Sequence, residues 1–178
     1  MFKAILILVA FNCTILVQFP QAQTHKPIRK AIAPSKSTEN INDSAYIYHN
    51  LGWTAYKAAD FGVARYYWEL GSNYNTKASS KYSCAFRLGL LNQTGEGVGI
   101  DYEKAYNYYF KASANGQSMG NVDATKNIAS YYENGIYLPK DNSKALEWYL
   151  KAKAQGNKFC DEDIARVRKF LVKGWVNK

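Results

Sequence analysis

The residues that could carry catalysis or bind a metal are few and widely spaced. The chain of 178 residues has two histidines, His25 and His49, and three cysteines, Cys13, Cys84 and Cys160. Neither histidine has a cysteine, histidine or aspartate at the spacing of a metal site, and neither an HExxH nor a GxSxG motif occurs. We therefore predict no catalytic residue, no cofactor and no metal ion, and we do not expect an enzyme.

A glycine-rich segment, GEGVG at positions 95–99, suggests a phosphate-binding loop at first sight. No Gly-Lys-Ser/Thr follows the segment and no strand is expected before it, as a P-loop requires. The pattern instead favours a tight connection with positive φ angles, which glycine adopts without strain.

One helix face near the start of the folded region gathers residue types that are common in binding sites. Spacings of 3, 4 and 3 residues place Tyr46, His49, Trp53 and Tyr56 on that face. Aromatic anchors dominate the energy of many interfaces, so the face is a candidate ligand surface. The alternative is that these aromatics pack under the N-terminal segment or against an exposed first edge.

Residues 1–22 resemble an export signal. The apolar run from Ala4 to Val17 follows a single charge, Lys3, and is too short to span a bilayer, which needs roughly 20 residues. A small residue, Ala22, ends the segment and is where we expect cleavage. The chain is then periplasmic or secreted, without a stable transmembrane anchor; an uncleaved anchor is the alternative.

Residues 23–43 are polar and basic, and we expect a flexible leader before a folded domain at 44–176. Removing residues 1–22 removes Lys3 and no acidic residue, so the net charge falls from +9 to +8. The basic residues are scattered rather than clustered, so we do not expect nucleic acid. Attraction to anionic lipid, a cell-wall polymer or an acidic partner protein is favoured.

The folded region contains an internal repeat of forty residues. Shifting the chain by forty superposes pairs that are identical or similar: Leu88 and Ile128, Gly95 and Gly135, Asp101 and Asp141, Lys104 and Lys144, Ala105 and Ala145, Tyr109 and Tyr149, Lys111 and Lys151, Ala112 and Ala152, and Gly116 and Gly156. The same pattern extends upstream with altered spacing. We expect repeats at about 45–78, 80–116 and 121–156, and a capping helix at 158–174.

Each repeat is predicted to form two helices. The second helix starts at Asp60, Asp101 or Asp141, whose carboxylate can accept a hydrogen bond from an unpaired backbone N–H. Four residues later a small alanine lets neighbouring helices approach, and the aromatic pair that follows fills the gap between units. Because one unit cannot bury its apolar face alone, stacked units are expected to share a continuous core. This predicts an all-α fold, an αα-superhelix of about three helix pairs plus the C-terminal capping helix.

These residues resemble the Sel-one-like repeat family, relatives of the tetratricopeptide repeats, whose pattern is roughly LGxxYxxGxGVxxDxxKAxxWYxKAAxxG. The second unit matches at Leu88-Gly89, Gly97-Val98, Asp101, Lys104-Ala105, Tyr109, Lys111-Ala112 and Gly116. The third unit matches at Gly135, Asp141, Lys144-Ala145, Trp148-Tyr149, Lys151-Ala152 and Gly156, but has Tyr137 where the family prefers glycine. The resemblance covers about 45–174 and implies a binding scaffold whose partners vary.

In superhelices of this class the first helix of each unit lines the concave surface. The part of that surface formed by the first repeat would be aromatic, and the part formed by the last helices would be charged. In chain order its candidate partner-binding residues are Tyr46, His49, Trp53, Tyr56, Phe86, Leu90, Lys126 and Arg166.

Cys84 and Cys160 occupy equivalent repeat positions, so we expect them to lie on the order of 20 Å apart, too far for a disulfide. They are expected to be two buried small residues. Cysteine-rich relatives proposed to bind or hydrolyse β-lactams carry a cysteine pair in each repeat, which this chain lacks.

The favoured interpretation is an exported protein–protein interaction module, and the resemblance allows a sharper version. That version is an immunity protein or regulator that inhibits a cell-envelope enzyme or a secreted toxin. Two alternatives stay open: a hydrolase of cell-wall or β-lactam amide bonds, and a carbohydrate-binding envelope scaffold.

Overall fold

The computed structural model describes residues 41–114 and 119–176. The expected export signal with cleavage at Ala22, and the leader up to residue 40, lie outside the described residues. Within these ranges the chain is all-helical, with helices α1 (Ile41–Lys57), α2 (Phe61–Asn73), α3 (Ser79–Thr94), α4 (Tyr102–Ala112), α5 (Met119–Asn134), α6 (Asn142–Ala154) and α7 (Asp161–Val176). Helix α1 begins at Ile41, so its first three residues belong to the segment expected to be leader.

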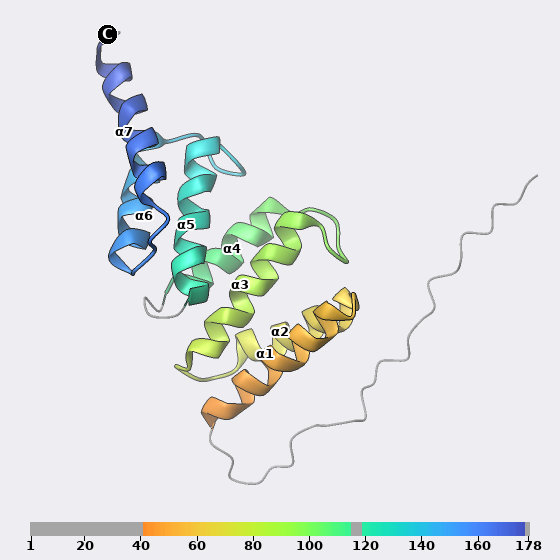
Figure 1. Cartoon of the computed structure of the whole chain (residues 1–178). Helices are drawn as coiled ribbons and strands as arrows, with labels where there is room; N and C mark the ends of the chain where they lie inside the picture. Colours follow the sequence, from red (N-terminus) through yellow and green to blue (C-terminus); the bar gives the residue numbers. More distant parts are fainter. Residues whose placement is uncertain (1–40, 115–118, 177–178) are drawn as a thin grey trace, which may run out of the picture. The chain divides into compact units, whose positions relative to one another are not determined.

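The helices form consecutive pairs that stack along the chain, as Figure 1 shows. Helix α1 packs on α2, α3 on α4, and α5 on α6, while α1 also contacts α3 and α3 contacts α5. The predicted αα-superhelix of three helix pairs and a capping helix is thereby confirmed for the described part of the chain. The odd-numbered helices form one layer, and we call its solvent-facing side the odd-helix face.

The second helix of each pair begins as the sequence predicts. Asp60, Asp101 and Asp141 precede α2, α4 and α6, and each carboxylate accepts a hydrogen bond from the backbone N–H three residues later, at 2.9–3.1 Å. These contacts satisfy N–H groups that have no partner inside the helix.

The buried residues gather at the boundaries between units. One cluster joins Trp68 of α2 to Leu88 of α3, a second joins Tyr109 of α4 to Ile128 of α5, and a third joins Tyr149 of α6 to Val167 of α7. Each cluster therefore needs its neighbouring unit to exclude water, which is how stacked repeats become stable.

In the first two repeats, close approach of the paired helices depends on a glycine at the same repeat position, where the third repeat has Ala129. A Cβ at Gly52 would lie 2.3 Å from Nε1 of Trp68, and a Cβ at Gly89 would lie 2.5 Å from Cε1 of Tyr109. Both rings are buried, so no larger residue fits there without displacing the second helix.

The loop between paired helices uses positive φ angles, as expected for the GEGVG segment. Gly95 and Gly97 have φ angles of 78° and 70°. Tyr137 stands where Gly97 stands one repeat earlier and has a φ of 61°, a conformation that costs a bulky residue free energy.

Cys84 and Cys160 are both free and buried, as expected. Burial raises the pKa of the Cys84 thiol to about 12, so the group behaves as a small apolar side chain.

Candidate functional site

The four predicted residues of α1 do not play equal parts. Tyr46 is 60% exposed, while His49, Trp53 and Tyr56 are half-buried. The Tyr56 ring packs edge-on against Phe61 and lies 5.8 Å from the Trp68 ring. Tyr56 therefore belongs mainly to the packing between α1 and α2.

The hydroxyl of Tyr56 fixes α1 to the loop after α3. It donates to the Glu96 carboxylate at 3.0 Å, and this hydrogen bond raises the Tyr56 pKa. The bond joins the first repeat to the second and holds the first turn of the glycine-rich loop.

Arg87 of α3 brings the α1 residues together into one site. Its guanidinium carbon lies 4.4 Å from the centre of the Trp53 ring, which stacks on Tyr56 at 5.4 Å with an angle of 9° between the ring planes. This is the geometry of a cation–π contact. We call the group formed by His49, Trp53, Tyr56 and Arg87 the Arg87 site.

The electrostatics of the Arg87 site are set by partial burial. Burial lowers the pKa of His49, and the charge of Arg87 lowers it further against an opposing hydrogen bond with Asn50. His49 is therefore neutral at pH 7. Burial also lowers the pKa of Arg87, which nonetheless stays charged at neutral pH.

Phe86 and Leu90 lie apart from the Arg87 site. Both are half-buried and pack against the cluster that joins α4 to α5, with the Phe86 ring 5.9 Å from that of Tyr109. They contribute to the boundary between the second and third repeats rather than to an open aromatic surface.

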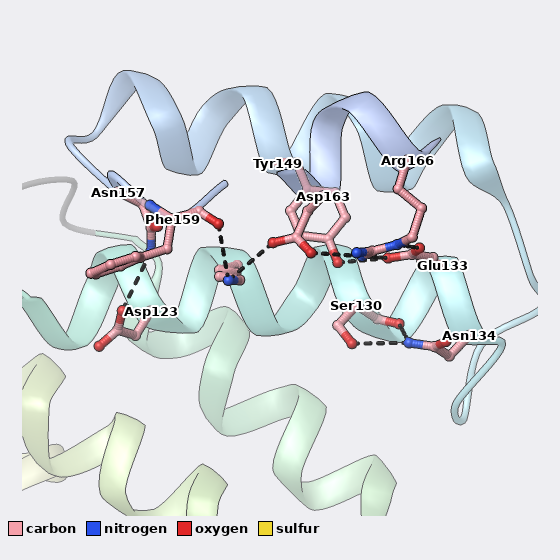
Figure 2. A network of polar contacts seen from close by, with 10 residues as sticks. Asp123, Ser130, Glu133, Asn134, Tyr149, Asn157, Phe159, Asp163 and Arg166 are labelled. Carbon is pink, nitrogen blue, oxygen red and sulfur yellow. Dashed lines mark hydrogen bonds and ion pairs between the residues drawn. The ribbon is translucent and has the colours of Figure 1, made fainter. Parts of the chain in front are cut away.

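Lys126 and Arg166 meet in an ion-pair network between α5 and α7, drawn in Figure 2. Lys126 Nζ lies 3.0 Å from Asp163, and Arg166 Nη2 lies 2.6 Å from the other oxygen of the same carboxylate. Arg166 also donates to both oxygens of Glu133, at 2.7 and 2.9 Å. The Tyr149 hydroxyl donates to Glu133 at 2.7 Å.

These contacts pair Lys126 and Arg166, the two cations predicted to bind a partner, with carboxylates of the same chain. The hydrogen bond from Arg166 is the main cause that lowers the pKa of Glu133, so the buried carboxylate is charged at neutral pH. Lys126 and Arg166, the charged part of the predicted surface, therefore mainly hold the capping helix α7 against α5.

Sequence reasoning missed Arg87, although a signal for it exists. Arg87 directly follows Phe86. Because residues on one helix face recur every 3 or 4 positions, either of these two neighbours could lie on the face toward α1. Which of the two turns toward α1 depends on the rotation of α3, which the repeat pattern leaves open.

Two further surfaces lie on the even-numbered helices. A pocket of about 430 Å³ lies between α2 and α4, and its charges pair locally, Arg65 with Glu69 at 3.8 Å and Lys104 with Asp101 at 2.8 Å. Aromatic rings also line up across α4 and α6, from Tyr137 through Tyr106 and Phe110 to Trp148.

Residues 41–114 and 119–176 contain neither a metal-binding cluster nor a membrane-spanning helix. No group of three or more histidine, cysteine, aspartate or glutamate side chains in these ranges could hold a metal ion. None of the helices described there has an apolar stretch long enough to cross a lipid bilayer.

Comparison with known proteins identifies the repeats. Residues 83–117 and 122–157 each match the family model described as Sel1 repeat. The fold is similar to the crystal structure of a Sel1 repeat protein from Oxalobacter formigenes, with 20% identity and a TM-score of 0.60 over 72% of this chain. The match covers 51% of that protein, so the chain spans about half its length. No curated protein matches the chain.

Proposed function

Since the chain is a Sel1-like repeat protein, we propose that it is an exported module that binds another protein through the Arg87 site. Sel1 repeat proteins are generally protein–protein interaction modules, and their fold is an interaction scaffold rather than an enzyme.

The observation that carries the proposal is the composition of the Arg87 site. Tryptophan, tyrosine and arginine are the residue types that most often dominate binding energy in interfaces. Trp53 and Arg87 come from different repeats and remain partly accessible, and the exposed Tyr46 extends the same face of α1. A partner that covered these side chains would desolvate a preformed aromatic and cationic surface.

We further propose that the protein acts in the periplasm or outside the cell as an inhibitor of an envelope enzyme or a secreted toxin. The apolar run at Ala4 to Val17 supports export. The net charge of +8 that remains after removal of residues 1–22 favours an acidic target.

Site-specific photo-crosslinking in the producing cells tests the proposal. A photoreactive phenylalanine replaces Tyr46 on the odd-helix face or, as a matched control, Tyr66, which is 48% exposed on α2. We expect an adduct with one protein from position 46 and none from position 66. Equal adducts from both positions, or none from position 46, would contradict binding at this face.

A second candidate function is binding of a cell-wall carbohydrate, which the aromatic row on α4 and α6 favours. Phe110 is 54% exposed, and Lys151 lies 4.3 Å over the Trp148 ring beside it. Exposed ring faces can stack on sugars. Sedimentation with insoluble cell wall tests this function: Phe110→Ala should release the protein from the pellet, and Tyr66→Ala should not.

A further inference from the structure

The Arg87 guanidinium is half-buried without an ionic partner. Among the side chains that the structure describes, none forms an ion pair or a hydrogen bond with it. Arg166, by contrast, is bound by two carboxylates. Partial burial without an acceptor is costly for a charged group, which is usually paired when it leaves water.

The contact with Trp53 leaves the donors of Arg87 free. Guanidinium is planar, with five N–H groups that point outward in its plane. The guanidinium carbon lies over the face of the Trp53 ring, 4.4 Å from its centre. The ring has no oxygen that could accept a hydrogen bond, so this contact leaves N–H groups of Arg87 available for a carboxylate.

Asp123 of α5 is the carboxylate whose charge acts on Arg87, and among the described residues no ion pair joins the two. The Asp123 carboxylate accepts a hydrogen bond from Asn157 at 3.5 Å, as Figure 2 shows. It therefore balances part of the Arg87 charge but does not occupy its donors.

We propose that Arg87 receives one carboxylate of an acidic side chain on the partner protein, held by two parallel N–H···O bonds beside the Trp53 ring. This inference rests on the proposed function and names the chemistry of the partner segment. Planar guanidinium and carboxylate groups match in this way, and the pair is stronger than a neutral hydrogen bond.

The surroundings favour a carboxylate over a phosphate. The site offers a single positive charge, since His49 is neutral at pH 7, and this matches a single negative charge. The ring of Trp53 provides apolar surface for the methylene groups of a glutamate or aspartate.

A titration of the full chain, as purified from producing cells, tests the inference. The probe is N-acetylglutamate amide, with N-acetylglutamine amide as the neutral isostere, at matched ionic strength. Signals of the Arg87 Nε–H and the Trp53 indole N–H are followed by NMR. We expect saturable shifts with the glutamate probe alone, with a Kd of about 1–10 mM.

Two variants separate this site from general attraction of anions. Arg87→Gln should raise the Kd at least about tenfold, whereas Arg168→Gln, at an exposed residue of α7, should leave it unchanged. Equal shifts with both probes, an unchanged Kd in Arg87→Gln, or saturation by inorganic phosphate but not by the glutamate probe would overturn the inference. Unchanged circular dichroism confirms that each variant is folded.

The titration and the crosslinking can fail independently. An adduct at position 46 that persists in Arg87→Gln at wild-type yield would keep the binding of a partner protein at the odd-helix face and overturn the carboxylate inference. A specific titration without any adduct at position 46 would do the reverse.

Discussion

Replacing Arg166 with methionine should loosen the capping helix by a predictable amount. The change leaves the Glu133 carboxylate, which is only 7% exposed, with the Tyr149 hydroxyl but without the two N–H donors of Arg166. Methionine retains most of the apolar stem. The effect therefore reports on the lost ion pairs, with Glu133 and with Asp163, rather than on lost packing.

The magnitude follows from the burial of the two partners. Removing one member of a buried pair costs about 3–5 kcal/mol, and a fully exposed pair contributes about 0.2–1 kcal/mol. The Arg166 side chain is 46% exposed while that of Glu133 is buried, so we expect a loss of about 2 kcal/mol in the free energy of unfolding. With an m value of about 2 kcal/mol per molar urea, the midpoint falls by about 1 M.

A double-mutant cycle with Glu133→Gln isolates the pair. Gln93 stands at the equivalent position one repeat earlier and accepts from the Tyr109 hydroxyl at 2.7 Å, so glutamine should keep the bond to Tyr149. The two substitutions together should cost about 1–2 kcal/mol less than their sum.

The cycle also has a pH dependence with a defined sign. The folded pKa of Glu133 is lowered, so its stabilising contribution is present above its ordinary pKa of 4.5 and is lost as the pH falls through the lowered value. Urea unfolding at pH 7 and pH 3, followed by circular dichroism, measures this, with Arg168→Met as the control. A cost for Arg166→Met below about 0.5 kcal/mol at pH 7, or a cost as large at pH 3 as at pH 7, would refute the reasoning.

Three further predictions concern packing, strain and titration. Gly89→Ala should destabilise by about 1–2 kcal/mol because its Cβ would lie 2.5 Å from a buried ring, whereas Gly99→Ala meets open space and should be neutral in urea unfolding. Tyr137→Gly should be about 1 kcal/mol more stable than Tyr137→Ala, since only glycine relieves the positive φ; equal midpoints would contradict strain there. The folded pKa of His49 is lowered, so the stability of the protein should fall as the pH drops below about 6.5. In His49→Asn the thermal midpoint should therefore change less between pH 7.5 and pH 5 than in the wild type.

The sequence predicts the architecture well because its determinants are local and repeated. The capping aspartates, the small alanines and the buried aromatics recur at fixed spacing, so each can be read without knowing the neighbouring unit. Tyr137 shows how strongly the repeat determines the backbone. It adopts the positive φ of Gly97, its equivalent one repeat earlier, although this conformation costs a bulky residue free energy.

The candidate site is predicted only in part, because it depends on how neighbouring helices are rotated. His49 and Trp53 lie on the expected face, but Phe86 turns into the boundary between repeats and Arg87 takes the place beside α1. Helix α7 begins with three acidic residues, yet nothing in the repeat pattern indicates that one of them, Asp163, binds Lys126.

The central claim is that a partner protein binds at the Arg87 site, and the affinity of the partner crosslinked at position 46 tests it most directly. The measurement compares the wild-type chain with Arg87→Gln and Arg168→Gln by calorimetry at physiological salt. The account predicts that Arg87→Gln weakens binding by roughly tenfold or more, as expected for an interface hot spot, while Arg168→Gln binds like the wild type. Equal affinity of the wild type and Arg87→Gln, or an equal loss in both variants, would contradict it.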